Sequence, residues 1–143
     1  MIQSMNNIKT KSPPEIAAKL RVLVVDNNHA FVTTMGWMVE LLGYDVRLAS
    51  SGPEAIEIAK AFLPNIVLID IGLPGMDGCE VCRIMREEPG LRQTVFIAQT
   101  GWEPEECKKY FSGTENFDHY MVKPVDIKVL EQVLTSVNQS RQS

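Results

Sequence analysis

Short apolar runs alternate along this chain with longer segments in which apolar residues recur every three or four positions. The runs are rich in valine and isoleucine, and the first and third are nearly continuous, as in strands buried on both faces of a parallel sheet. The predicted strands cover residues 21–25, 45–49, 65–69, 94–98 and 117–122. An antiparallel sheet would instead favour polar residues at alternate positions along each strand.

The segments between these runs carry the start and stop signals of helices. Asn28 is placed to cap a helix that Gly43 ends, and Ser51-Gly52-Pro53 begins another that ends before Pro64. The predicted helices cover residues 29–42, 51–62, 79–88, 104–111 and 126–137. Five strands and five helices in regular alternation predict an α/β fold, with one parallel sheet covered by helices on both faces.

The length of 143 residues fits a single domain, which we expect to span residues 20–138. Residues 1–19 are polar and contain Pro13-Pro14, a composition typical of a flexible tail or linker. Residues 139–143 are polar as well and are expected to form a short C-terminal tail.

Composition and charge argue against two classes of function. The chain is 45% hydrophobic and 22% charged with a net charge of −4, and its lysines and arginines form no cluster. Direct binding of nucleic acid is therefore disfavoured, because it needs several cations on one face. No apolar run is long enough to cross a membrane, and the N-terminus lacks the apolar core of a signal peptide. We expect a cytoplasmic protein with no membrane contact.

Polar side chains follow the predicted strands at their carboxyl ends, where open α/β sheets bind their ligands. The first strand is followed by Asp26 and Asn27, and the third by Asp70. The fourth is followed by Thr100, and Lys123 lies at the end of the fifth. Each residue alone has an ordinary interpretation as a helix cap, a turn former or a surface side chain. Their conjunction in this order favours a site.

These residue types fit a phosphoryl-transfer site. A carboxylate such as Asp70 can act as a nucleophile and form an aspartyl-phosphate. A second carboxylate nearby, Asp26, would repel it by about 4 kcal/mol at ~4 Å, so the pair needs a cation, and Mg²⁺ suits one or two carboxylates plus phosphate. Lys123 would add a second positive charge, and the Thr100 hydroxyl could donate to a phosphoryl oxygen.

With these motifs in place, the chain resembles the receiver domain of response regulators over about residues 21–137. The segments that carry the resemblance are Val22–Asn28, Leu68–Gly78, Ala98–Gly101 and Phe117–Pro124. The second and fourth segments are the most specific, and their sequences most resemble those of receivers attached to hybrid histidine kinases. The resemblance implies a flavodoxin-like, doubly wound sheet with the strand order 2-1-3-4-5.

The resemblance also implies the role of each site residue. Asp70 would be the phosphoacceptor, and Mg²⁺ would be held by Asp26, Asp70 and the backbone carbonyl of Gly72. Lys123 would contact the phosphoryl group, and the Lys123-Pro124 peptide would be cis.

Signalling in such a domain would use a switch pair. The Thr100 hydroxyl would move toward the phosphoryl group while the Tyr120 ring turns inward, and the fourth strand, fourth helix and fifth strand would change shape. The donor would be a histidine kinase or a histidine phosphotransfer protein. The domain would be a signalling module rather than an enzyme.

Two positions depart from the family pattern or add to it. Asn27 stands where the family usually has a second acidic residue, so we expect Mg²⁺ binding to be weakened but not abolished. Trp102, two residues beyond Thr100, could hinder attack by water on the phosphoryl group. It could equally serve as an aromatic contact for a partner.

Three other readings of the sequence stay open. A pseudo-receiver that binds partners without phosphorylation is supported by Asn27 alone. A flavodoxin-like enzyme would need a glycine-rich or hydroxyl-rich phosphate loop after the first strand, which is missing here. Cys79 and Cys82 form a CxxC, but inside a helical pattern, where packing is a better explanation than redox or metal chemistry.

Overall fold

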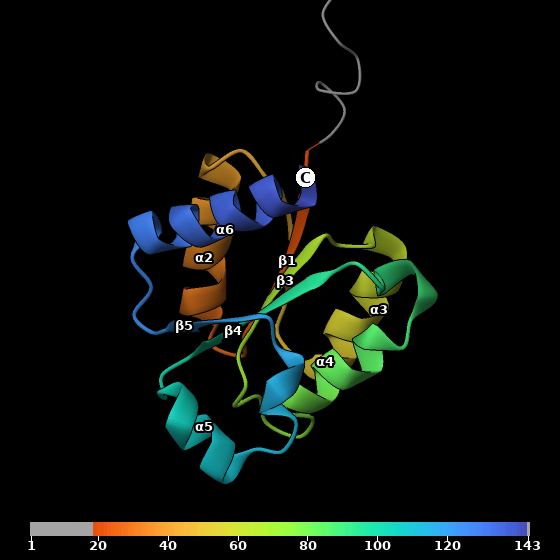
Figure 1. Cartoon of the computed structure of the whole chain (residues 1–143), viewed down its shortest axis with the longest axis vertical. Helices are drawn as coiled ribbons and strands as arrows, with labels where there is room; N and C mark the ends of the chain where they lie inside the picture. Colours follow the sequence, from red (N-terminus) through yellow and green to blue (C-terminus); the bar gives the residue numbers. More distant parts are fainter. Residues whose placement is uncertain (1–18, 143) are drawn as a thin grey trace, which may run out of the picture.

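A five-stranded parallel sheet forms the centre of the molecule (Figure 1), whose computed structural model describes residues 19–142. The strand order is β2-β1-β3-β4-β5, as the sequence predicted. The strands are β1 (Arg21–Val25), β2 (Asp45–Ala49), β3 (Ile66–Ile69), β4 (Val95–Thr100) and β5 (His119–Val122). Every neighbouring pair is parallel, so the carboxyl ends of all five strands lie at one edge.

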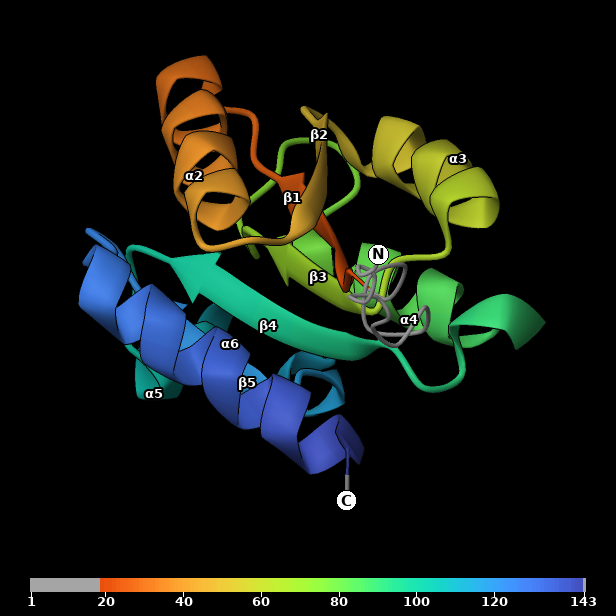
Figure 2. The ribbon, with the colours of Figure 1, turned by 90° about the horizontal axis from the view of Figure 1, so that it is seen from above.

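The helices form a layer on each face of this sheet (Figure 2). One layer consists of α2 (His29–Leu41) and α6 (Ile127–Gln142). The other contains α3 (Gly52–Phe62), α4 (Gly78–Arg86) and α5 (Pro104–Tyr110), with the short 3₁₀ turns η2 (Pro89–Leu91) and η3 (Thr114–Asn116).

Each layer buries its own hydrophobic cluster, because successive strand residues point to opposite faces. In β1, Val22 and Val24 belong to the cluster under α2 and α6, whereas Leu23 and Val25 belong to the cluster under α3 and α4. All four are fully buried, as the unbroken apolar run predicted.

Local polar contacts fix where the helices begin. The side chains of Asn28, Ser51 and Asp77 each accept a hydrogen bond from a backbone N–H in the first turn of α2, α3 and α4, respectively. These caps place the start of each helix directly after a strand or the loop that follows it. The starts of α2 and α4 therefore lie beside the carboxyl ends of β1 and β3.

The structure differs from the sequence prediction mainly at the ends of elements. Strand β4 continues through Gln99 and Thr100, because these polar residues still pair with Met121 and Val122 of β5. Helix α6 continues to Gln142, past the predicted end at Val137, so the predicted C-terminal tail is mostly helical. Its polar last turns lack an apolar signal but contain no proline or glycine that would end a helix.

The predicted tail at residues 1–19 lies outside the described residues except for Lys19, and the domain boundaries stay a prediction. Among residues 19–142, no helix combines the length and apolarity that a membrane span requires.

Candidate functional site

Two carboxylates lie side by side at the carboxyl edge of the sheet. Val25 and Ile69 are partners in the pairing of β1 with β3, and the next residue on each chain is Asp26 or Asp70. The Asp26 side chain is only 1% exposed, while that of Asp70 is 14% exposed. Asp70 is therefore the member of the pair that a ligand can reach.

Lys123 supplies the positive charge that this pair needs. Its Nζ lies 2.6 Å from Asp26 Oδ2 and 3.6 Å from Asp70 Oδ2. The backbone N–H of Lys123 donates to the Thr100 carbonyl oxygen at 2.7 Å, which ties the end of β5 to the end of β4. The Lys123-Pro124 peptide is cis, as expected.

The Asp70 carboxylate is held at both oxygens. Oδ1 accepts a hydrogen bond from the Gly72 N–H at 3.1 Å, and Oδ2 faces Lys123. Burial raises the pKa of Asp70 above its ordinary value of 3.8, Lys123 and the Gly72 N–H oppose this rise, and the nearby charge of Asp26 adds to it. The carboxylate is thus a partly desolvated anion in a fixed orientation.

Gly78, at the start of α4, closes the loop behind Asp70. Its N–H donates to the Ile71 carbonyl oxygen at 2.8 Å, and a Cβ atom at this position would lie 2.8 Å from Ile71 Cα. Such a contact with rigid backbone requires glycine. From the sequence, Gly78 was predicted only to lie in a loop. Nothing in the local pattern indicated that this glycine supports Asp70.

Thr100 and Tyr120 lie on the same face of neighbouring strands. Thr100 is 4% exposed, and its hydroxyl oxygen accepts a hydrogen bond from the Trp102 N–H at 3.3 Å. The Tyr120 hydroxyl donates to the Thr114 carbonyl oxygen at 2.7 Å, and its ring packs edge-on against Phe117. Within residues 19–142 no hydrogen bond joins Thr100 to Asp70, so the structure brings the two near one edge without linking them.

Trp102 packs on α5 in this structure. Its ring centroid lies 5.2 Å from that of Tyr110 and 5.4 Å from that of Phe111, and 42% of the residue remains exposed. The three rings form an aromatic cluster at the surface of α5.

The two asparagines after β1 have different surroundings. Asn27 is exposed, and its side chain makes no hydrogen bond in the described part of the chain. Asn28 donates its backbone N–H to Asp26 Oδ1 at 2.9 Å, while its side chain caps α2. The sequence predicted the cap but not the bond to Asp26.

Gln99 lies one strand away from Asp70 in the pairing of β4 with β3. It is fully buried, and neither polar atom of its amide has a hydrogen-bond partner among residues 19–142.

The CxxC cysteines belong to the hydrophobic cluster under α3 and α4. Burial raises the pKa of Cys79 to about 12 and that of Cys82 to about 11, which disfavours the thiolate that redox or metal chemistry requires. Within residues 19–142 no three His, Cys, Asp or Glu side chains are grouped to hold a metal. The packing interpretation accounts for both cysteines.

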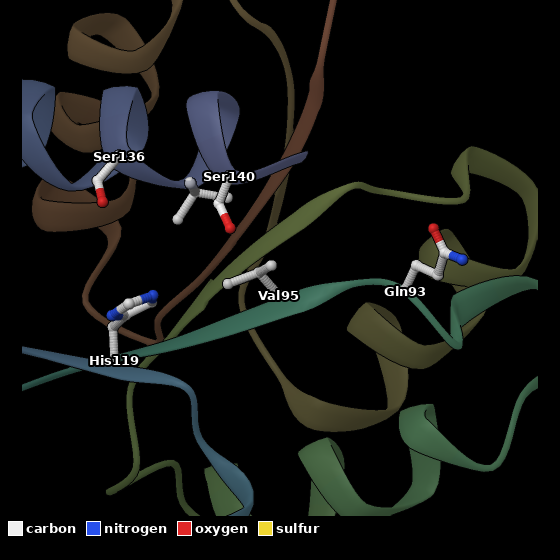
Figure 3. A pocket seen from close by; sticks show the side chains of 6 residues that line it. Gln93, Val95, His119, Ser136 and Ser140 are labelled. Carbon is white, nitrogen blue, oxygen red and sulfur yellow. The ribbon is translucent and has the colours of Figure 1, made fainter. Parts of the chain in front are cut away.

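A separate hollow of about 310 Å³ lies at the opposite edge of the sheet, between α6 and the start of β4 and β5 (Figure 3). Ser136 and Ser140 of α6 point toward Val95 and His119 across it. Its described lining contains no acidic or basic side chain apart from His119, an exposed residue of β5.

Two neighbouring carboxylates bridged by a lysine thus lie at the carboxyl edge of a parallel sheet with the strand order 2-1-3-4-5. The model of the response regulator receiver domain family matches residues 22–135, and the chain belongs to this family.

Individual relatives agree with this assignment. The chain is 34% identical over 104 residues to the alkaline phosphatase synthesis transcriptional regulatory protein PhoP of Bacillus subtilis, covering 73% of this chain and 42% of PhoP. It is 33% identical over 115 residues to the signal transduction histidine-protein kinase BarA of Shigella flexneri, covering 80% of this chain and 12% of BarA. The chain thus spans less than half the length of either relative.

A solved structure resembles the fold closely. The receiver domain of the sensor histidine kinase PA1611 from Pseudomonas aeruginosa, solved with a magnesium ion coordinated in its active-site cleft, superposes with a TM-score of 0.76 at 25% identity. The alignment covers 85% of this chain and 99% of that domain.

Proposed function

We propose that this protein is a phosphoacceptor in a two-component phosphorelay and takes a phosphoryl group on Asp70 from a histidine kinase or a histidine phosphotransfer protein. The observation that carries the proposal is the state of Asp70. Its carboxylate is oriented by the Gly72 N–H, lies 3.6 Å from Lys123 Nζ and is the more accessible member of the acidic pair.

The chemical step is a transfer between two nucleophiles. An oxygen of Asp70 attacks the phosphorus of a phosphohistidine, the phosphorus–nitrogen bond breaks, and the histidine ring keeps the electron pair. The product is an acyl phosphate on Asp70 and a histidine that regains its proton from water. Lys123, whose Nζ lies 3.6 Å from Asp70 Oδ2, would neutralise charge on the phosphoryl oxygens. No separate substrate is turned over, so we assign a signalling role rather than an enzymatic one.

The oxygen donors at this edge fit Mg²⁺. Two carboxylates, Asp26 and Asp70, share one corner of the sheet, and the Gly72 carbonyl is in the loop directly after Asp70. Mg²⁺ is commonly held by one or two carboxylates plus phosphate and water, and it would draw charge from the phosphoryl oxygens. Asn27 would contribute at most a neutral amide oxygen.

Replacing Asn27 by aspartate is expected to tighten Mg²⁺ binding about tenfold, because a third carboxylate adds a favourable charge beside the ion. Magnesium titrations followed by tryptophan fluorescence or by NMR would compare the native protein with Asn27→Asp. The exposed Gln132→Glu, on α6, is a control for net charge. Equal affinities of the native protein and Asn27→Asp would contradict the prediction.

The output surface is proposed to be β4, α5 and β5. Thr100 of β4 and Tyr120 of β5 would connect the site with this face, and the cluster of Trp102, Tyr110 and Phe111 lies on it. A shift of the Thr100 hydroxyl toward the phosphoryl group would break its bond with the Trp102 N–H and so disturb the aromatic cluster.

Trp102 is proposed to slow the loss of phosphate by restricting water. We expect Trp102→Ala to release phosphate several-fold faster, measured as the decay of the phosphorylated protein after the donor is removed. Tyr110→Ala removes another ring of the same cluster and tests whether the effect belongs to Trp102. An unchanged decay rate in Trp102→Ala would leave the ring with a role in partner contact only.

The donor is proposed to dock beside Lys123. An apolar groove of about 390 Å³ opens there between α2 and the loop after β5. Its walls are formed by Phe31, Thr34, Met35, Met38, Lys123, Pro124 and Val125. A helix that carries the phosphohistidine could lay apolar side chains in this groove while its imidazole faces Asp70.

The proposed function is tested by phosphorylation with acetyl phosphate and intact-mass spectrometry. We expect a gain of one phosphoryl group that depends on Mg²⁺. Borohydride reduction of the acyl phosphate, followed by peptide mapping, should place the modified residue at Asp70. A folded protein that gains no phosphoryl group would favour the alternative, a binding module that works without phosphorylation.

A further inference from the structure

We propose that Phe31 is a positioning residue that holds the Lys123 ammonium over the carboxylate pair through a cation–π contact. This inference rests on the proposed function, because it assigns the residue that orients Lys123 for the phosphoryl group. Lys123 Nζ lies 4.3 Å from the centroid of the Phe31 ring, within the range of a cation–π interaction. Phe31 is half-buried on the first turn of α2.

The contact closes a cycle of interactions that begins and ends at Asp26. Asp26 Oδ1 accepts from the Asn28 N–H at 2.9 Å, and the Asn28 side-chain oxygen accepts from the Phe31 N–H at 3.0 Å. The Phe31 ring then faces the Lys123 ammonium, which returns to Asp26 Oδ2 at 2.6 Å. Each member is thereby fixed by two neighbours.

This cycle of contacts restricts a long side chain that is otherwise flexible. A lysine side chain loses rotamer entropy when it is held in one orientation, and a single ion pair seldom compensates for that loss. Asp26 attracts the ammonium from one side, while the ring covers another and leaves the Asp70 side open. Phe31 also lines the apolar groove beside Lys123, so a partner side chain in that groove would contact the residue that orients the lysine.

The test compares Phe31→Leu, which removes the aromatic face, with Phe31→Tyr, which keeps it. Trp37→Leu is the matched control, because Trp37 is an exposed aromatic on the same helix, with 68% of its surface accessible. The first measurement is the NMR shift of the Lys123 ε-methylene protons in the unphosphorylated proteins. The ring current of Phe31 should shift these protons upfield in the native protein, Phe31→Tyr and Trp37→Leu, and the shift should disappear in Phe31→Leu.

The second measurement is the rate of phosphorylation by acetyl phosphate, which needs no docking groove. We expect Phe31→Leu to be about two- to fivefold slower, and Phe31→Tyr to match the native rate. The proposal is overturned if the native protein shows no upfield shift, if Phe31→Tyr loses rate as Phe31→Leu does, or if Phe31→Leu keeps the native rate. If the native protein accepts no phosphoryl group, the proposed function fails, and the NMR comparison alone decides the role of Phe31.

Discussion

Replacing Asp70 by asparagine is expected to abolish phosphoryl acceptance and, at neutral pH, to make the folded protein more stable. The first effect follows because an amide is not a nucleophile for phosphorus, and the neighbouring carboxylate, that of Asp26, is only 1% exposed. The second follows because burial and the charge of Asp26 raise the pKa of Asp70 in the folded state.

The sign of the stability effect depends on pH. A carboxyl group whose pKa is raised by folding favours the folded state below its unfolded value of 3.8, and this contribution is lost as the pH rises through the folded value. At neutral pH the native protein therefore keeps a charge that folding disfavours, and the uncharged asparagine avoids it. We expect a gain on the order of 1 kcal/mol, the usual scale of a single substitution.

Urea denaturation of the native protein and Asp70→Asn across the acidic to neutral range would measure this gain. The difference between the two should shrink as the pH falls below the folded pKa of Asp70. Asp45→Asn, on the exposed edge strand β2, is a control for removal of a carboxylate elsewhere. A variant less stable than the native protein at neutral pH would mean that attraction to Lys123 outweighs burial.

Replacing Lys123 by methionine is expected to destabilise the protein by about 2–4 kcal/mol and to make its stability depend on magnesium. Removing one partner of a buried ion pair leaves an uncompensated charge, and here two carboxylates would face each other. We expect a loss of stability near the lower end of the usual range for a buried pair, because the Lys123 side chain is 23% exposed.

Added Mg²⁺ should restore part of this loss, because a divalent ion can replace the missing ammonium between Asp26 and Asp70. Denaturation with and without Mg²⁺ would show it, and phosphorylation by acetyl phosphate should be slowed as well. Lys128→Met, at an exposed position on α6, is the matched control. The prediction is wrong if Lys123→Met unfolds at the native denaturant concentration in the absence of magnesium.

The sequence alone predicted the fold well, because most strands are marked by an apolar run and most helices by a cap or a proline. It predicted the strand order through the family resemblance. It could not predict that β4 extends through Gln99 and Thr100, because those residues are polar and their strand pairing depends on β5. The extra turns of α6 likewise lack an apolar signal.

The residues of the site were predictable where they are polar side chains that directly follow a strand, because their type alone indicates the chemistry. The structure brings Asp26, Asp70 and Lys123 together as expected. The supporting residues were not predictable in the same way. Gly78 matters because of a close backbone approach, and Phe31 because one turn of α2 places its ring against a lysine 92 positions later in the chain. Both depend on tertiary distances that a single sequence does not encode locally.

The division of the interior into two hydrophobic clusters has a consequence for how such a domain can diversify. Helices α2 and α6 share one cluster, and α3, α4 and α5 share the other, with the sheet between them. Substitutions that reshape the groove beside α2 therefore need no compensating change beneath α5, and the reverse also holds. Under the proposed function, the surface for the donor and the surface for the output could thus change, by evolution or by design, as separate traits joined through the ends of the strands.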